Sequence, residues 1–114
     1  MATLTEALRT GEFLISEASG TRSREEVTID LSAGAMVAGT VVSKLATGKW
    51  VAYGDVGTDG SEVAAGILYA AVPNSAADQK GVVIVRDAEV AEIRLTGINA
   101  GGKVDLAALG IIVR

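Results

Sequence analysis

One stretch of the sequence has the residue types and spacing of a phosphate-binding loop. Gly97, Gly102 and Lys103 satisfy the Gly-x4-Gly-Lys part of that motif, in which backbone N–H groups and a lysine hold phosphates. The next residue is Val104, where the motif has a Ser or Thr whose hydroxyl binds magnesium. Only residues 104–114 follow the lysine, too few for the parallel α/β sheet that carries such loops. We therefore interpret this stretch as a glycine-rich turn.

A second stretch imitates a calcium-binding loop. Asp55, Gly57, Asp59 and Gly60 fall at positions 1, 3, 5 and 6 of an EF-hand loop, but position 12 is Gly66 instead of the bidentate glutamate. The pattern predicts a hairpin turn with side-chain capping and no metal.

Other routes to catalysis find little support in the sequence. The chain contains no His and no Cys, and its remaining polar residues form no spacing that pairs a nucleophile with a base. Asp87, Glu89 and Glu92 form a carboxylate patch, which we interpret as the solvated face of an edge strand. The sequence predicts no enzyme, no cofactor and no catalytic residue.

Composition restricts the possible partners. At 114 residues and 11.5 kDa the chain fits one domain, and its net charge of -4 disfavours direct binding to nucleic acid, whose affinity comes largely from Lys and Arg. No apolar run approaches the roughly 20 residues that span a bilayer, and the N-terminus has no basic flank or apolar signal core. We expect a protein that is neither secreted nor bound to a membrane.

Strand signals recur about every ten residues from residue 36 onward, separated by turn residues such as Thr47-Gly48 and Pro73-Asn74. Short, evenly spaced strands favour a small compact β-barrel or sandwich-like domain. The expected strands are Met36–Leu45, Lys49–Tyr53, Val63–Val72, Gly81–Arg86 and Val90–Leu95.

The end of the chain has a different pattern. Lys103–Leu109 contains good helix formers, and Gly110 stands where a helix commonly ends in the left-handed conformation. We expect one short C-terminal helix there. Ile111–Val113 is β-branched and predicts a closing strand or a docking tail.

The first third of the chain is richer in charge. Its apolar cluster Phe13–Ile15 lies between polar stretches, and Val27, Ile29 and Leu31 alternate with polar neighbours like a half-buried strand. We therefore expect an extended N-terminal arm over residues 1–26 and a β-rich domain over 27–114.

One rival interpretation is a small β-barrel binding or carrier domain. Val37–Val42 resembles a strand of biotinyl or lipoyl carriers, and Lys44 and Lys49 surround the Thr47-Gly48 turn. Neither lysine has the neighbours that such carriers use for the swinging cofactor. This alternative stays open from the sequence.

A more specific resemblance covers most of the chain from Gly11 onward. Gly48–Tyr53, followed by the Thr-Asp-Gly turn and the strand ending Ala65-Gly66-Ile67-Leu68, resembles the head decoration proteins of lambda-type tailed phages. Similarity to members from Mu-like prophages continues in Gly11–Glu17, Gly20–Glu25, Ile84–Val90 and Ala107–Arg114.

The resemblance implies a structural capsid decoration protein. Such proteins are mainly β, associate as homotrimers at three-fold positions on the outer capsid surface, and stabilise the expanded head against packaged DNA. The implied partners are the major capsid protein and the chain itself, and the implied location is the virion, after synthesis in the host bacterial cytoplasm.

The arm would then be the capsid-binding segment. An extended arm can add a strand to a capsid sheet, with Phe13 and Ile15 inserted from one face of the chain and Leu14 on the other. We expect residues up to about Gly20 to be mobile until the capsid orders them. The expected capsid-binding residues are Glu12, Phe13, Leu14, Ile15, Ser16, Arg22 and Arg24.

Overall fold

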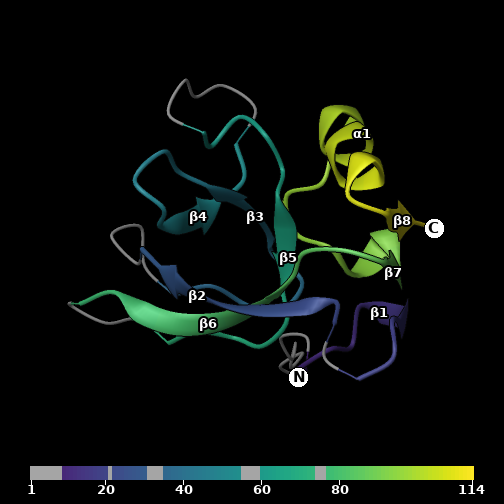
Figure 1. The fold of residues 1–114 in the computed structure, drawn as a ribbon, viewed down its shortest axis with the longest axis horizontal. Coiled ribbons are helices and arrows are strands. Elements are labelled where there is room, and N and C mark those ends of the chain that lie inside the picture. The colour runs from purple at the N-terminus through teal and green to yellow at the C-terminus, as the bar shows by residue number, and fades with distance from the viewer. Residues whose placement is uncertain (1–8, 21, 31–34, 55–59, 74–76) are drawn as a thin grey trace, which may run out of the picture.

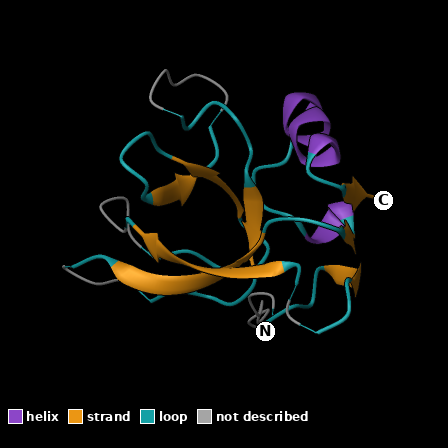
Figure 2. Ribbon diagram, viewed as in Figure 1, coloured by secondary structure: helices purple, strands orange, loops and turns teal. Residues whose placement is uncertain are grey.

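The computed structural model describes residues 9–20, 22–30, 35–54, 60–73 and 77–114. The fold is mainly β, as expected, and has a closed five-stranded barrel beside a three-stranded sheet and a helix (Figures 1 and 2). The barrel contains β2 (Arg24–Ile29), β3 (Val41–Lys44), β4 (Trp50–Ala52), β5 (Gly66–Leu68) and β6 (Gln79–Ile84). The other layer contains β1 (Leu14–Glu17), β7 (Ala88–Val90), the 3₁₀-helix η1 (Glu92–Arg94), α1 (Ala100–Ala108) and β8 (Ile111–Val113).

The barrel is built around the long antiparallel ribbon of β2 and β6. It closes where β2 meets β4 in parallel, at Ile29 opposite Trp50. Gly81 in β6 leaves room for the core, because a Cβ there would lie 2.9 Å from Cγ1 of Ile29. The interior is aliphatic apart from Trp50, in agreement with the low aromatic content of the sequence. Its buried side chains include Val27, Ile29, Val42, Trp50, Leu68 and Val83.

A second core lies between the barrel and the outer layer. It joins Ile67 from the barrel with Phe13, Leu106 and Ile111, residues that come from both ends of the chain. All four side chains are completely buried. The two ends of the sequence therefore stabilise each other through a shared apolar cluster.

The sheet β1-β7-β8 has β7 in the middle, antiparallel to β1 and parallel to β8. Glu89 therefore lies on a central strand, and our expectation of an edge strand at Asp87–Glu92 was wrong. The expected strand Val90–Leu95 also ends early. After Val90 the chain turns into η1, where the Arg94 N–H donates to the carbonyl of Ala91.

Helix α1 explains the phosphate-loop pattern structurally. The Asn99 side chain caps the helix by accepting from the N–H of Gly102 at 2.7 Å, and it also accepts from the Tyr53 hydroxyl at 3.0 Å. Gly102 is buried against Tyr53, where a Cβ would lie 3.1 Å from the ring. The helix thus begins before the expected Lys103 and ends as expected, with Gly110 at φ +82°.

The described part of the expected arm is integrated into this fold. Residues 13–17 belong to the second core and to the sheet, and β2 already begins at Arg24. The physical reason is that Phe13 buries a large apolar surface while β1 gains main-chain hydrogen bonds with β7, and together these offset the entropy of ordering the segment. The expected mobility of residues up to about Gly20 does not describe residues 13–17.

Candidate functional site

The expected capsid-binding residues lie around β1, but they do not share one environment. Phe13 is completely buried in the chain's own core and is not available as a capsid anchor. Leu14 is half-buried and packs against the same core. Ile15 is 54% exposed. A pattern of alternation alone had placed Phe13 and Ile15 on the same face, and that expectation was wrong.

The reason is an irregularity in the β1–β7 ladder. Leu14 lies opposite Val90 while Ser16 lies opposite Glu89, so the register shifts at Ile15. Such a bulge leaves one residue unpaired and redirects its side chain. β1 is also an edge strand, which leaves one side of its backbone without a strand partner within the described part of the chain. Ile15 and this open edge form an exposed surface.

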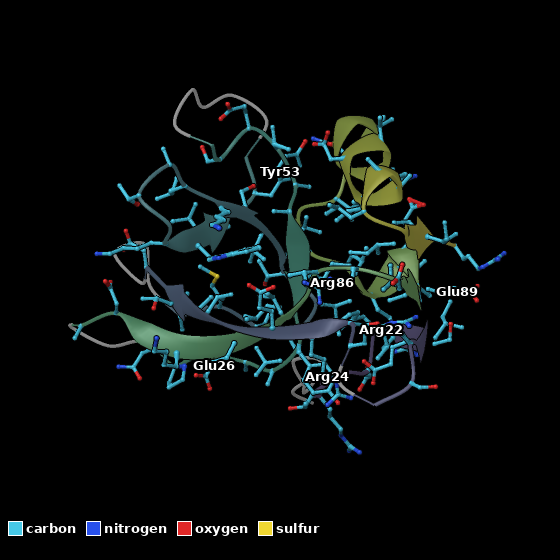
Figure 3. The ribbon with its side chains drawn as sticks, viewed as in Figure 1. Arg22, Arg24, Glu26, Tyr53, Arg86 and Glu89 are labelled. Atoms are coloured by element: carbon cyan, nitrogen blue, oxygen red, sulfur yellow. The ribbon has the colours of Figure 1, made fainter. Side chains whose placement is uncertain are left out.

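Glu89 joins the three strands of the sheet on its outer face. Its carboxylate accepts from the Ser16 hydroxyl of β1 at 3.1 Å and from the Arg114 guanidinium that follows β8. The hydrogen bond from Arg114, followed by that from Ser16, lowers the pKa of Glu89 below its ordinary value. Figure 3 shows Glu89 on the side of the molecule where β7 and β1 lie.

Two further site residues make exposed ion pairs to distant parts of the chain. Glu12 accepts from Arg94 of η1 at 2.6 Å. Arg22 lies 3.8 Å from Asp87, in the turn before β7. Both pairs tie the entry into β1 and β2 to the C-terminal half of the chain.

Arg24 has a more enclosed position than Arg22, although the sequence put the two side by side. Its guanidinium donates to both carboxylate oxygens of Glu17, at 2.5 and 3.1 Å, and lies 4.1 Å from the centre of the Tyr69 ring. The hydrogen bond to Glu17 raises the pKa of Arg24, which keeps its positive charge. Tyr69 was missed by the sequence reasoning because nothing in its local pattern links it to residues so far away.

The structure gives less support to the carrier lysine and to the calcium-like loop as functional sites. Lys49 forms an ion pair with Asp78 at 2.7 Å, and this hydrogen bond raises the pKa of Lys49. Residues 55–59 of the calcium-like pattern lie outside the described residues. Among the residues that the structure describes, no group of three or more His, Cys, Asp or Glu is arranged to hold a metal ion. No helix in the described ranges is long and apolar enough to cross a membrane.

The barrel and the terminal sheet make this a small, mainly β protein, and comparison with protein families supplies its class. The family model described as "Bacteriophage lambda head decoration protein D" matches residues 3–111. The chain belongs to this family. Membership implies binding to a phage capsid and a location in the phage virion. A search of curated proteins found no match.

Proposed function

We propose that this chain binds the outer surface of a phage head as trimers at three-fold positions and stabilises the expanded capsid. The observation that carries the proposal is the family match, which extends over residues 3–111. The role is structural and involves no catalytic residue, and the partners are the major capsid protein and other copies of the chain. The carrier alternative gains no support from Lys49, whose ammonium group is held by Asp78.

The attachment surface that we propose is the N-terminal side of the terminal sheet. Ile15 offers an exposed apolar side chain, and the open edge of β1 offers main-chain donors and acceptors to an extended capsid segment. Glu12, Leu14, Ser16 and Arg22 surround this edge in sequence. Phe13 contributes from inside the protein, by holding β1 on the barrel.

Self-association is favoured by apolar surface elsewhere. Val104 on α1 is 70% exposed, and Val63 and Leu109 border a groove between α1 and the barrel. A small domain that leaves such side chains in water gains stability when a partner covers them. Three copies joined in this way would also strengthen attachment, because each capsid contact raises the effective concentration of the others.

Binding to heads tests this proposal directly. Expanded heads that lack a decoration protein are mixed with the protein and sedimented, and the bound fraction is measured against concentration. Ile15→Ser should weaken binding by about tenfold or more, because it removes an apolar contact worth roughly 1.5–3 kcal/mol when buried. Ile112→Ser is the matched control, since Ile112 is an exposed isoleucine on β8, at the opposite edge of the same sheet.

Bound protein should also raise the temperature at which DNA-filled heads rupture. Failure of the wild-type protein to bind any head of its phage, or binding without an effect on rupture, would contradict the proposed function. Equal losses for the two isoleucine variants would reject the edge of β1 as the attachment surface.

A further inference from the structure

Four residues fasten the N-terminal segment to the barrel at two points, and we call them the clasp: Gly11, Glu17, Arg24 and Tyr69. At the first point the N–H of Gly11 donates to the carbonyl of Tyr69 at 2.8 Å. At the second, Glu17 at the end of β1 accepts two hydrogen bonds from Arg24 of β2. The clasp therefore holds both ends of residues 11–17, the stretch that contains Ile15.

Tyr69 connects the two points. Its ring lies under the Arg24 guanidinium, in the geometry of a cation–π contact. Its edge is so close to Gly11 that a Cβ there would lie 2.9 Å from Cε1 of the ring. Gly11 has φ +68°, a conformation that side-chain-bearing residues adopt rarely. Glycine at this position thus permits both the turn and the close approach to Tyr69.

The ion pair of the clasp is partly shielded from solvent. In the Arg24–Glu17 pair, the arginine side chain is 29% exposed and the glutamate side chain 18%, whereas both members of the Arg22–Asp87 pair are more than half exposed. Ion pairs that are sheltered and bidentate hold their geometry better than exposed single contacts. Arg24 is labelled in Figure 3, at the end of β2 that lies near β1.

From this geometry we infer that Tyr69 and Arg24 are positioning residues for capsid attachment, which they promote by presenting Ile15 and the β1 edge in the binding-competent arrangement. Arg24, expected from the sequence to contact the capsid, acts through Glu17 instead. The inference rests on the proposed function. A segment fixed before binding loses less conformational entropy when the partner engages it.

The test measures head binding by full-length variants of the clasp. Tyr69→Leu removes the ring but keeps apolar volume, and Arg24→Lys keeps the charge but cannot make the bidentate contact. Each should weaken binding about tenfold, which corresponds to the backbone entropy of roughly one residue that must be ordered again. Tyr69→Phe keeps the ring face and should lose less binding than Tyr69→Leu. Lys49→Gln breaks an ion pair outside the clasp and should also bind normally.

Two readouts separate positioning from general damage. Hydrogen exchange in the variants should be faster at Gly11 and in β1, while the barrel strands keep their wild-type protection. In addition, each clasp variant should be combined with Ile15→Ser. The fold-loss of head affinity in the double variant should be smaller than the product of the fold-losses in the two single variants, because both changes act on the same contact.

The outcomes also separate the proposed function from the role of the clasp. Wild-type protein that does not bind heads would reject the proposed function. If the wild type binds and Ile15→Ser weakens it, normal binding by both Tyr69→Leu and Arg24→Lys would overturn the inference alone. Double variants whose fold-loss of head affinity equals the product of the single-variant losses would overturn the inference as well.

Discussion

The barrel and the terminal sheet are built on opposite principles. The barrel is closed, so each of its strands pairs on both sides, and β3 and β4 are joined by the short turn at Thr47-Gly48. The terminal sheet is open and unites β1 with β8, from the two ends of the chain. Closed sheets resist further strand addition, whereas open edges invite it. The open edge is therefore the reason why we propose the terminal sheet, and not the barrel, as the attachment surface.

Phe13→Ala should have the largest effect of any change considered in the terminal layer. It leaves a cavity in a fully buried site, and comparable substitutions destabilise proteins by about 3–5 kcal/mol. The free energy of unfolding, measured with urea, should fall by that amount. The matched change Ile15→Ala should alter it by less than about 0.5 kcal/mol, because Ile15 is exposed. Similar values for the two variants would contradict the burial of Phe13.

Gly66→Ala should damage the barrel in a different way. A Cβ at Gly66 would lie 2.6 Å from the carbonyl oxygen of Ile84, where β5 pairs with β6. Because backbone cannot move aside easily, we expect a loss of about 1–3 kcal/mol in unfolding free energy. Gly54→Ala is the control for steric crowding, since nothing lies within 4 Å of that Cβ and its φ is not positive. A loss at Gly66 no larger than at Gly54 would contradict the close approach.

Asn99→Ala should remove one of the links between α1 and the residues around the barrel. The variant loses the N-cap and leaves the Tyr53 hydroxyl without this acceptor, so unfolding free energy should fall by about 0.5–2 kcal/mol. Asn99→Asp keeps a capping oxygen and should recover most of the loss. Thermal unfolding of the wild type and the two variants provides the measurement. Equal losses of stability in Asn99→Ala and Asn99→Asp would argue against the cap.

Replacing Glu89 should have the smallest effect, a change in how stability depends on pH. Because its pKa is lower in the folded protein, its contribution is complete above the ordinary pKa of 4.5 and is lost as pH falls through the folded value. Melting temperature should therefore decline with acid slightly less steeply in Glu89→Gln than in the wild type below pH 4.5. Identical slopes would mean that Arg114 and Ser16 do not favour the ionised form.

The sequence predicted the barrel better than the terminal layer, for physical reasons. Turn residues such as Gly48 and Pro73, and the helix end at Gly110, act locally and are visible in a short window. Phe13 was misjudged because charged neighbours surround it in the sequence. Glu12 and Glu17 find their partners Arg94 and Arg24 only in the folded chain. Local charge patterns do not reveal which of several nearby or distant charges will form a pair.

The exposure of the expected capsid-binding residues was harder to predict from the sequence. The family resemblance identified the class of partner and directed attention to residues 12–24. Which of these side chains point outward depends on the bulge at Ile15 and on contacts with Tyr69, features set by tertiary structure. The calcium-like pattern falls on residues 55–59, outside the described residues.

Hydrogen exchange of residues 13–17, in the isolated protein and on heads, tests the central claim most directly. The claim is that this segment belongs to the fold while its outer edge remains available to the capsid. It predicts protection in the isolated protein for the amides that face β7, and additional protection on heads for the amides at the open edge. Exchange at the rate of a free chain in the isolated protein, or no change upon head binding, would contradict it.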